Sequence, residues 1–551
     1  MKKVLIKLFF ARLIILVFTS YPWDIGAQHI QNVLTFYLRG EALSSTLVNP
    51  IYSLSHLREG KFLIQNHSFG SHNGKKHCGS RCSRSYANVY RKENVTFFHL
   101  PPLVLAMFEP FLIFIHDDWQ HFLLSLFMTV IDLVLALKLH DLVSRFMSLN
   151  SYTSSTNIRE EALQQHMDPR IQPKNTCLLF EPLYPTVRGE SISNQVSDSP
   201  DTTKLVKTPI INGEQAKTNE NIPVEEQKKV EQVVHNVSTV PKICAIFYFA
   251  NPISIVVCSS GICSIQGLCF FFLTSSLLEA CVGMKKTRQK HDRNIKPMNI
   301  PNIPNATLFL AFATYCELFY FVFLVPLISL VNKARGGKNL KKTISYCIIY
   351  FTLWTTILQL LSMMLVGRNN YSACIHQTYG QSASFSDLNP NLGLLWYLFI
   401  QMFQRFRPFF VVYLNLLPYI FIFPLLIRLH QYPLDLVVVF NFIWTIFKPS
   451  PTLHDLVFAL TFYLASPCSL SRTSNVSTIA LIAIPVPVSL YTMDYWLWLG
   501  TGVGNANYMF FQCLAYNIFI TAILVEFLSG AMKRDKALRL TEKMKFKSQK
   551  C

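Results

Sequence analysis

The sequence predicts an all-α fold, a polytopic transmembrane bundle of about twelve helical spans. The 551 residues are 51% hydrophobic, with 44 Phe and 23 Tyr, and only 15% are charged, whereas soluble domains average about 25% charged residues. The apolar residues fall in long blocks. The net charge of +19 collects in the short connections between these blocks, as the positive-inside rule requires. No basic surface interleaved with aromatic residues is visible, so we expect no nucleic acid partner.

Composition divides the chain into six regions. Residues 1–20 form an apolar segment after Met-Lys-Lys that is either a retained first helix, or signal anchor, or a short cleaved signal peptide; we expect the retained helix. Ser, Thr, Asn, Gln, Glu and Lys dominate the second long polar region, which is typical of disorder. The other five regions are a lumenal loop at 21–96, transmembrane helices at 97–147, a disordered cytosolic linker at 148–241, a transmembrane core at 242–532 and a basic cytosolic tail at 533–551.

The apolar blocks after the first helix give the predicted spans in order. Several blocks are shorter than the roughly 20 residues of a simple span. Short blocks fit a thin bilayer, re-entrant hairpins or helices buried within the bundle. The blocks are Phe97–His116, Gln120–His140, Ile243–Cys258, Cys263–Gly283, Ala306–Val331, Ile344–Val366, Leu392–Phe403, Pro408–Leu429, Leu434–Phe447, Leu453–Ser466, Ser477–Leu499 and Tyr508–Ala531.

The charges that flank the block Ala306–Val331 disfavour a single transmembrane span. Basic loops flank it on both sides, at Lys285–Lys296 and Asn332–Lys342. A single span would place one of these loops in the lumen, against the positive-inside rule. We therefore expect a hairpin of two short helices that turns near Cys316–Tyr320.

Glycosylation sequons offer a topology marker. Only lumenal sequons are usable, and the predicted topology favours those at Asn66, Asn94 and Asn370. The predicted lumenal loop also carries Cys78 and Cys82 close to three His residues. Zinc needs four ligands in tetrahedral geometry, but the spacing is loose and an oxidising lumen favours a disulfide or a free pair. We expect no metal site.

Carboxylates within apolar blocks are candidates for function, because charges at membrane depth are unfavourable. Asp132 lies in the middle of its block and is expected to make an interior polar contact. Asp117 and Asp118 mark a turn or a helix cap. A catalytic alternative is a multi-span GT-C mannosyltransferase with a dolichol-linked donor, which would use an acidic pair in the first lumenal loop. That loop holds only scattered acids, and no hydrolase motif such as G-x-S-x-G occurs, so no catalytic residue is expected.

The stretch Asp387–Phe406, DLNPNLGLLWYLFIQMFQRF, stands out. A polar turn rich in Asn, Pro and Gly leads directly into an aromatic segment, and such a turn must lie at the membrane interface or line a cavity. Its aromatic residues can form a wall or an interfacial belt, and its polar residues can bond a ligand or cap the turn. Arg405 can pair with a phosphate or act as a snorkelling anchor.

Six motifs, in order, carry a resemblance over roughly residues 97–535 without the linker. The motifs are FFHLPPL at Phe97–Leu103, VPKICAIFYFANPISI at Val240–Ile255, ATYCELFYFVFLVP at Ala313–Pro326, the stretch Asp387–Phe406, FKPSPTLHDL at Phe447–Leu456 and GVGNANYMFF at Gly502–Phe511. Together they resemble the PIG-U subunit family of GPI transamidase, the complex that attaches GPI anchors to proteins. Two departures are Gln401 and Arg405, where the family has Glu and His. A third is Phe319-Tyr320, where the family has Tyr-Pro.

The resemblance implies a non-catalytic, multi-pass subunit of the endoplasmic reticulum membrane with a fold like that of GT-C glycosyltransferases and no cofactor. It implies partners of the PIG-K, PIG-T, PIG-S and GPAA types, besides the GPI lipid and membrane lipids. The catalytic cysteine would belong to the PIG-K-type partner. The chain would position the GPI amine that attacks a thioester, which is a proximity contribution.

The resemblance also assigns expected roles to residues. The candidates for GPI binding are Asp387, Asn389, Asn391, Trp396, Tyr397, Phe399, Gln401 and Arg405. Interior or structural polar roles are expected for Asp132, Asp455, Asn505 and Asn507. Among these, Asp455 is expected to cap a helix, and the two Asn residues to fix the turn into the last helix.

Overall fold

Every regular element of the described chain is a helix. The computed structural model describes residues 1–20, 101–114, 117–152, 239–259, 265–281, 302–335, 339–385 and 388–548. Several predictions lie outside these residues: the loop with Asn66, Asn94, Cys78 and Cys82, most of the linker 148–241, and Asp387. The all-α class is confirmed within the described part.

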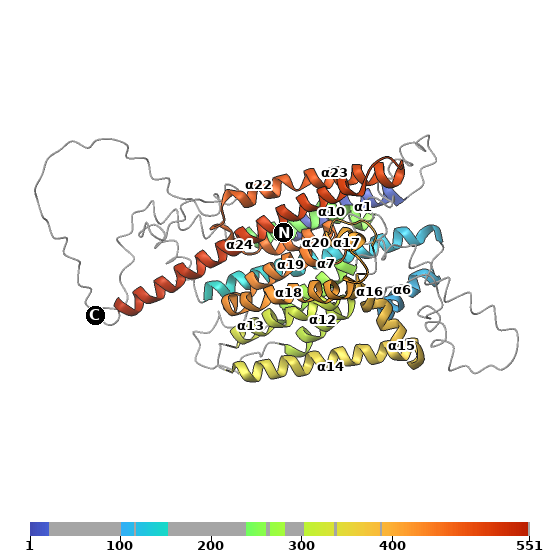
Figure 1. Ribbon diagram of the computed structural model, residues 1–551. Helices are drawn as coiled ribbons and strands as arrows, with labels where there is room; N and C mark the ends of the chain where they lie inside the picture. The colour runs from blue at the N-terminus through green and yellow to red at the C-terminus, as the bar shows by residue number, and fades with distance from the viewer. Residues whose placement is uncertain are drawn as a thin grey trace, which may run out of the picture.

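The helices run side by side in a bundle (Figure 1). In its first half they are α1 (Lys2–Ser20), α6 (Pro102–Phe114), α7 (Asp117–Tyr152), an unlabelled helix (Thr239–Ala250), α10 (Pro252–Ser259), α11 (Ile265–Ala280), α12 (Ile303–Cys316), the 3₁₀ helix η4 (Leu318–Phe323), α13 (Leu324–Ala334) and α14 (Leu340–Val366). In its second half they are α15 (Arg368–Ile375), the π-helix η5 (His376–Gly380), α16 (Gln381–Ser384), α17 (Leu395–Gln401), α18 (Arg407–Leu429), α19 (Pro433–Phe447), α20 (Leu453–Leu464), α21 (Pro467–Leu470), α22 (Asn475–Ala483), α23 (Pro485–Tyr495), the π-helix η6 (Trp496–Gly500) and α24 (Ala506–Ser548).

Five described segments are long and apolar enough to cross a membrane. They are Phe122–Phe146, Leu340–Val366, Arg407–Leu429, Asn475–Leu499 and Ala506–Lys536. A sixth forms if Thr239–Ala250 and Pro252–Cys258, which are bent by 46°, count as one span. The bend falls at Asn251-Pro252, because Pro lacks the N–H that would continue the helix. The other apolar blocks form helices of 10–17 residues, so the total of about twelve spans stays a prediction.

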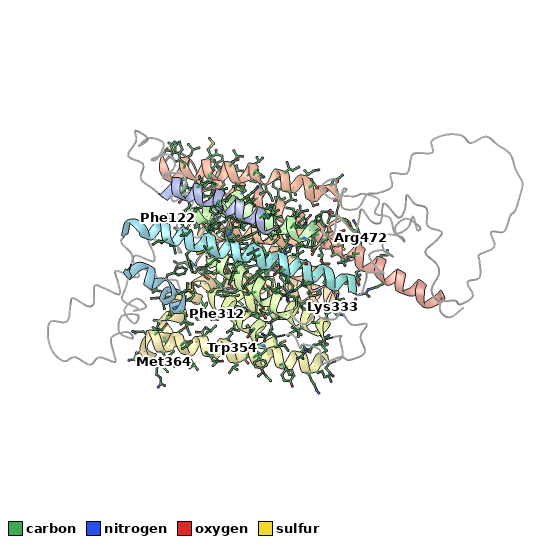
Figure 2. All side chains as sticks on the ribbon, turned by 180° about the vertical axis from the view of Figure 1, so that it is seen from behind. Phe122, Phe312, Lys333, Trp354, Met364 and Arg472 are labelled. Carbon is green, nitrogen blue, oxygen red and sulfur yellow. The ribbon has the colours of Figure 1, made fainter. Side chains whose placement is uncertain are left out.

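The short helices form the centre of the bundle. Nearly all of α19 and α20 is buried, and α11 has most of its residues in the core. Only 11% of the apolar windows in α14 and α18 is buried. Met364 of α14, for example, is 72% exposed and points outward at the edge of the molecule (Figure 2). Apolar side chains on the outside and short buried helices inside are the arrangement expected in lipid.

The block Ala306–Val331 reverses direction. Trp354 of α14 donates to the Pro304 carbonyl of α12, and Tyr315 bonds Ser362 further along both helices, so α12 and α14 are parallel. The segment α13 instead returns toward the start of α14, where Arg335 donates to Thr343. The structure thus forms the predicted hairpin, and the two helices separate at Glu317, inside the predicted turn.

The first helix is tied to the core by a buried ion pair. Arg12 of α1 donates to Asp132 of α7 at 2.9 Å, and both side chains are almost fully buried. Tyr248 and Cys258 also donate to this carboxylate, at 2.7 and 3.0 Å. The Arg12 guanidinium lies 4.1 Å from the centre of the Phe249 ring, a cation–π contact. Asp132 therefore makes an interior polar contact that joins three segments.

Positive charge gathers at one end of the bundle, which we call the basic end. Here α13 ends and α14 begins, and α24 carries Arg534 and Arg539 beside Arg428 of α18. This is the left end in Figure 1, where the C-terminal half of α24 (red) projects. The sequon residue Asn370 lies in α15, just after the opposite end of α14. The positive-inside rule assigns the basic end to the cytosol, which agrees with the predicted lumenal position of Asn370.

Candidate functional site

The helix break between α12 and η4 places an acidic side chain inside the bundle. Glu317 at this break has an extended backbone, with φ −147° and ψ 115°. Its backbone N–H still bonds the Ala313 carbonyl, but the helix does not continue. The Glu317 Oε1 atom lies 2.9 Å from Lys448 Nζ. The chain thus breaks here without the Pro expected from the resemblance, and the carboxylate bonds a buried ammonium.

Lys448 is the centre of a three-residue ion network. It directly follows α19, in an extended conformation that ends the helix. Its Nζ lies 3.0 Å from Asp455 Oδ1, and both side chains are at most 5% exposed. Asp455 is held in turn by the Thr452 N–H and hydroxyl, at 2.9 and 2.8 Å, in a capping box at the start of α20. With Glu317, the network has two carboxylates and one ammonium.

A cavity of about 120 Å³ opens beside this network, and we call it the α18 cavity. One wall is aromatic, because Phe319 stacks on Trp444 with ring centres 4.0 Å apart and lies 6.0 Å from Tyr419. The lining also contains polar residues, among them Glu317, Lys448, Thr378, Tyr379 and Asn415. Its full lining is Cys316, Glu317, Leu318, Phe319, Thr378, Tyr379, Ser382, Ala383, Phe385, Leu414, Asn415, Pro418, Tyr419, Trp444, Phe447, Lys448, Pro449 and Ser450.

The short elements η5 and α16 form part of the lining of the α18 cavity and cover it on one side. Tyr379 of η5 donates to the Tyr315 carbonyl at 2.6 Å, which fixes this cover to the end of α12. Asn415 of α18 donates to the Ala383 carbonyl at 2.6 Å. A π-helical turn such as η5 is rare and often occurs at functional sites. The cover is therefore held to both α12 and α18 by specific hydrogen bonds.

The predicted turn before α17 packs against the loop that follows Lys448. Asn391 is buried; its Oδ1 accepts from the Gly393 N–H at 2.8 Å and its Nδ2 donates to the Pro449 carbonyl at 3.4 Å. A Cβ on Gly393 would lie only 2.7 Å from Pro451, so the close approach requires glycine. Asn389 is exposed. The turn thus packs against the loop that follows Lys448 and supports it.

Two of the predicted aromatic residues face away from the cavity. Trp396 is buried near Trp498, with ring centres 6.5 Å apart. Tyr397 stacks on Phe510 of α24 at 4.1 Å, and its hydroxyl donates to the Asn507 side chain. Asn505 accepts from the Asn507 N–H at 3.1 Å, which fixes the turn into α24. These contacts join α17 to the C-terminal helices.

Phe399 contacts the lining of the α18 cavity through Phe385, as Asn391 does through Pro449. The two Phe rings are stacked with centres 4.9 Å apart, and Phe385 lines the cavity. Gln401, the last residue of α17, and Arg405, which follows the helix, are both exposed. The neighbouring Arg407, which the sequence analysis did not select, donates to the Phe385 carbonyl at 3.0 Å. Within the described residues, the predicted residues thus make contacts in several directions, and their role in GPI binding stays a prediction.

Sequence reasoning assigned no role to Lys448. Two signals were present: an ionisable residue directly after an apolar block, and an acid seven positions later in the same motif. Glu317 was visible as a charge within an apolar block, but its partner was not. The described residues contain no group of three or more His, Cys, Asp or Glu that could hold a metal ion.

Fold and site together define a class: an all-helical protein with membrane-length apolar helices and a buried ion network beside a cavity. Comparison with known proteins identifies the family. A family model described as "GPI transamidase subunit PIG-U" matches residues 84–516. The chain belongs to this family.

Curated relatives carry matching names. The chain is 28% identical over 235 residues to "GPI transamidase component GAB1" of Saccharomyces cerevisiae, covering 42% of this chain and 57% of the yeast protein. It is 25% identical over 306 residues to "GPI-anchor transamidase component PIGU" of Homo sapiens, covering 54% of this chain and 64% of the human protein. A GAB1 homolog of Schizosaccharomyces pombe is 32% identical over 149 residues, with 27% of this chain and 36% of that protein covered. The chain thus spans less than two thirds of the length of these relatives.

Proposed function

We propose that this chain is a non-catalytic, multi-pass subunit of a GPI transamidase in the endoplasmic reticulum membrane, and that it binds the GPI lipid through the α18 cavity. Family membership supports the complex, and the apolar helices support the membrane. The single observation that carries the lipid role is the cavity itself, which combines an aromatic wall with a buried ion network. A fold of about twelve spans like that of GT-C glycosyltransferases is part of this proposal.

The charge of the network suits a cationic or hydroxyl-rich headgroup. Two carboxylates face one ammonium, so Glu317 can accept a further hydrogen bond from an ammonium or a sugar hydroxyl. Amino groups and hydroxyls are the donors that a glycolipid headgroup offers. Asn415 and Thr378 add neutral hydrogen-bonding groups on the same lining.

The size of the cavity and the surface of α18 suit an amphiphile. A volume of about 120 Å³ is below the roughly 300–1,000 Å³ of a pocket that encloses a whole ligand, so only part of a headgroup enters. Leu414, Asn415, Pro418 and Tyr419 of α18 line the cavity, while Phe409, Val412, Leu416 and Ile420 of the same helix are exposed. The helix can therefore direct its lining toward the headgroup and an apolar face toward acyl chains.

Catalysis would then come from a partner. We propose that subunits of the PIG-K, PIG-T, PIG-S and GPAA types assemble with this chain, and that a partner thiolate forms the thioester that the GPI amine attacks. The contribution of this chain is to hold the lipid in reach, which raises the effective concentration of the amine. The residues of the stretch Asp387–Phe406 stay candidates for a second contact with GPI at the exposed positions Asn389, Gln401 and Arg405.

The test uses a substitution that should fill the α18 cavity and leave the fold intact. Ala383 is exposed, lines the cavity and bonds Asn415 only through its backbone, so Ala383→Trp should occupy the space without breaking that bond. The matched control is Ile482→Trp, on the exposed face of α22 and outside both the cavity lining and α18. The tagged full-length chain is purified in mild detergent, and co-purifying proteins and GPI lipids are quantified by mass spectrometry.

We expect the wild type and Ile482→Trp to retain a caspase-like subunit and GPI, and Ala383→Trp to retain the subunit but lose GPI. Recovery of the tagged wild-type chain without any transamidase subunit would overturn the assignment to the complex. Equal GPI recovery in both variants would overturn the cavity as the lipid site. Mannosyl transfer by the purified chain from a dolichol-linked donor would instead support the enzyme alternative.

A further inference from the structure

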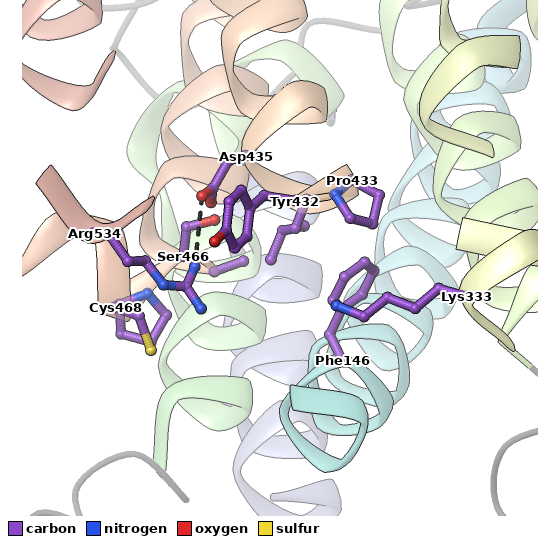
Figure 3. Close-up of a pocket in the computed structure, with 11 residues that line it drawn as sticks. Phe146, Lys333, Tyr432, Pro433, Asp435, Ser466, Cys468 and Arg534 are labelled. Carbon is purple, nitrogen blue, oxygen red and sulfur yellow. Dashed lines mark ion pairs between the residues drawn. The ribbon is translucent and has the colours of Figure 1, made fainter. Parts of the chain in front are cut away.

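A second, smaller pocket lies at the basic end of the bundle, and we call it the basic-end pocket. It encloses about 20 Å³ between α7, α13, α19 and the α20–α21 connection, with one wall from α24. Lys333 and Arg534 reach toward it from opposite sides, while Tyr432 and Asp435 lie between them (Figure 3). It is separated from the α18 cavity by the length of α19, whose 15 residues span about 22 Å.

The lining carries more positive than negative charge. Lys333 and Arg534 are cationic and Asp435 is the single carboxylate in the lining. Asp435 is already engaged, because Ser469 donates to it at 2.7 Å and Arg534 lies 3.5 Å away. Charge-assisted hydrogen bonds are normally about 2.7–2.9 Å long, so the Arg534 contact is loose. Within the described residues, the Lys333 side chain makes no ion pair or hydrogen bond.

A buried hydroxyl in the same pocket has no partner. Ser466 is 4% exposed, lines the pocket, and its Oγ makes no hydrogen bond with any described residue. Buried polar groups nearly always have a partner. The Ser466 hydroxyl and the Lys333 ammonium line the same pocket, and both can donate a hydrogen bond to an anionic oxygen.

Tight packing fixes the position of Arg534. A Cβ on Gly530, one turn earlier in α24, would lie 2.5 Å from the Ser469 carbonyl. The backbone of α24 therefore approaches α21 as closely as glycine allows. This contact sets the guanidinium over the Tyr432 ring, 5.1 Å from its centre. The cationic wall is thus held by helix packing and does not depend on a flexible surface loop.

The dimensions limit what can enter. A volume of about 20 Å³ holds little more than one water-sized group, which needs roughly 10–15 Å³. Only one or two oxygens of a tetrahedral anion would fit, with the remainder outside the pocket. The location at the basic end corresponds to the level at which lipid headgroups meet water.

We propose that the basic-end pocket binds the phosphate group of an anionic phospholipid, with its oxygens between Lys333, Arg534 and the Ser466 hydroxyl. This site is distinct from the α18 cavity, at the other end of α19. It would fix the headgroup of one lipid at the junction of α13, α19 and α24.

The test measures thermal stabilisation of the purified full-length chain in its complex. Short-chain phosphatidic acid is the probe, phosphatidylcholine with the same chains tests the apolar contribution, and inorganic phosphate tests a soluble source. A ligand that binds only the folded state raises Tm with its concentration. The variants are Lys333→Gln and Ser466→Ala, and the matched control is Lys533→Gln, which removes an exposed charge next to Arg534 but outside the pocket.

We expect phosphatidic acid to raise the Tm of the wild type and of Lys533→Gln more than phosphatidylcholine does. Lys333→Gln should weaken binding roughly tenfold or more, as expected when a charged hydrogen bond is lost. Ser466→Ala should weaken it less and leave the ligand-free Tm unchanged, since that hydroxyl has no partner to lose. A similar Tm rise with inorganic phosphate, lost in Lys333→Gln, would support the phosphate site and assign it to a soluble ligand. Equal phosphatidic acid responses in the wild type and both pocket variants, or no response in the wild type, would overturn the proposal.

Discussion

The two ends of α19 use the same kinds of charged residues in opposite ways. At its C-terminal end, Lys448 is enclosed by Glu317 and Asp455 at 2.9 and 3.0 Å, and Asp455 is also held by a capping box. At its N-terminal end, Asp435 meets Arg534 at 3.5 Å and Lys333 stays unpaired among the described residues. A closed network contributes to stability, whereas an open one leaves a charge available for a ligand. The comparison therefore predicts large stability effects at one end and small ones at the other.

The largest effect is expected for Lys448→Ala. Removal of the ammonium leaves two carboxylates close together in a nearly buried site, and breaking a buried pair in this way destabilises by about 3–5 kcal/mol. Thermal unfolding of the purified chain in detergent, followed by intrinsic fluorescence, measures this loss. Glu317→Gln in the same background should recover part of the lost stability, because it removes one of the two uncompensated charges. If Lys448→Ala lost less stability than the basic-end variants, that result would contradict the comparison.

Gly393→Ala should give the next largest effect. Its Cβ would lie 2.7 Å from Pro451 and 2.9 Å from Asn391 Oδ1, so the turn must move away from the loop that follows Lys448. Overpacking of this kind destabilises by about 1–3 kcal/mol. Gly502→Ala is a useful contrast, since no atom lies within 4 Å of its Cβ position but its φ of +70° strains any other residue. Unchanged stability of Gly393→Ala would show that the turn does not support the Lys448 loop.

Asp435→Asn at the basic end should have a smaller effect, about 1–1.5 kcal/mol, because it weakens the hydrogen bonds of a buried side chain without removing the acceptor. The Asn side chain can still accept from Ser469, and Arg534 keeps its contact with the Tyr432 ring. The same unfolding measurement compares it directly with Lys448→Ala. A loss as large as that of Lys448→Ala would mean that the two ends are built alike.

Lys333→Gln should have the smallest effect on ligand-free stability, within about 0.5 kcal/mol of wild type. The described residues give Lys333 no ion pair to lose, although it lines the basic-end pocket. A large destabilisation would show that the side chain has a structural role. The proposed phosphate site would then need a different residue.

The fold was predictable where a local pattern determines it. The apolar blocks predict the helices, and the two basic loops around Ala306–Val331 predict the hairpin, because charge flanking is readable from the sequence. The mid-block position of Asp132 predicts an interior contact, but its partner Arg12 lies 120 positions away. No local pattern identifies a partner at that distance.

The site was harder to predict, because the stretch Asp387–Phe406 was treated as a single surface. A helix of seven residues such as α17 points successive side chains in different directions, about 100° apart at 3.6 residues per turn. Tyr397 therefore stacks on Phe510, while Phe399, about 200° further round the helix, stacks on Phe385. The Lys448–Glu317 contact joins two chain breaks 131 positions apart, and tertiary packing alone brings them together.

The central claim is that the α18 cavity holds part of the GPI headgroup, and an experimental density map of the assembled complex with bound GPI tests it most directly. The account predicts headgroup density between Glu317 and Asn415, with the acyl chains along the exposed face of α18. Density for GPI at another face, with no headgroup atoms in the α18 cavity, would contradict it.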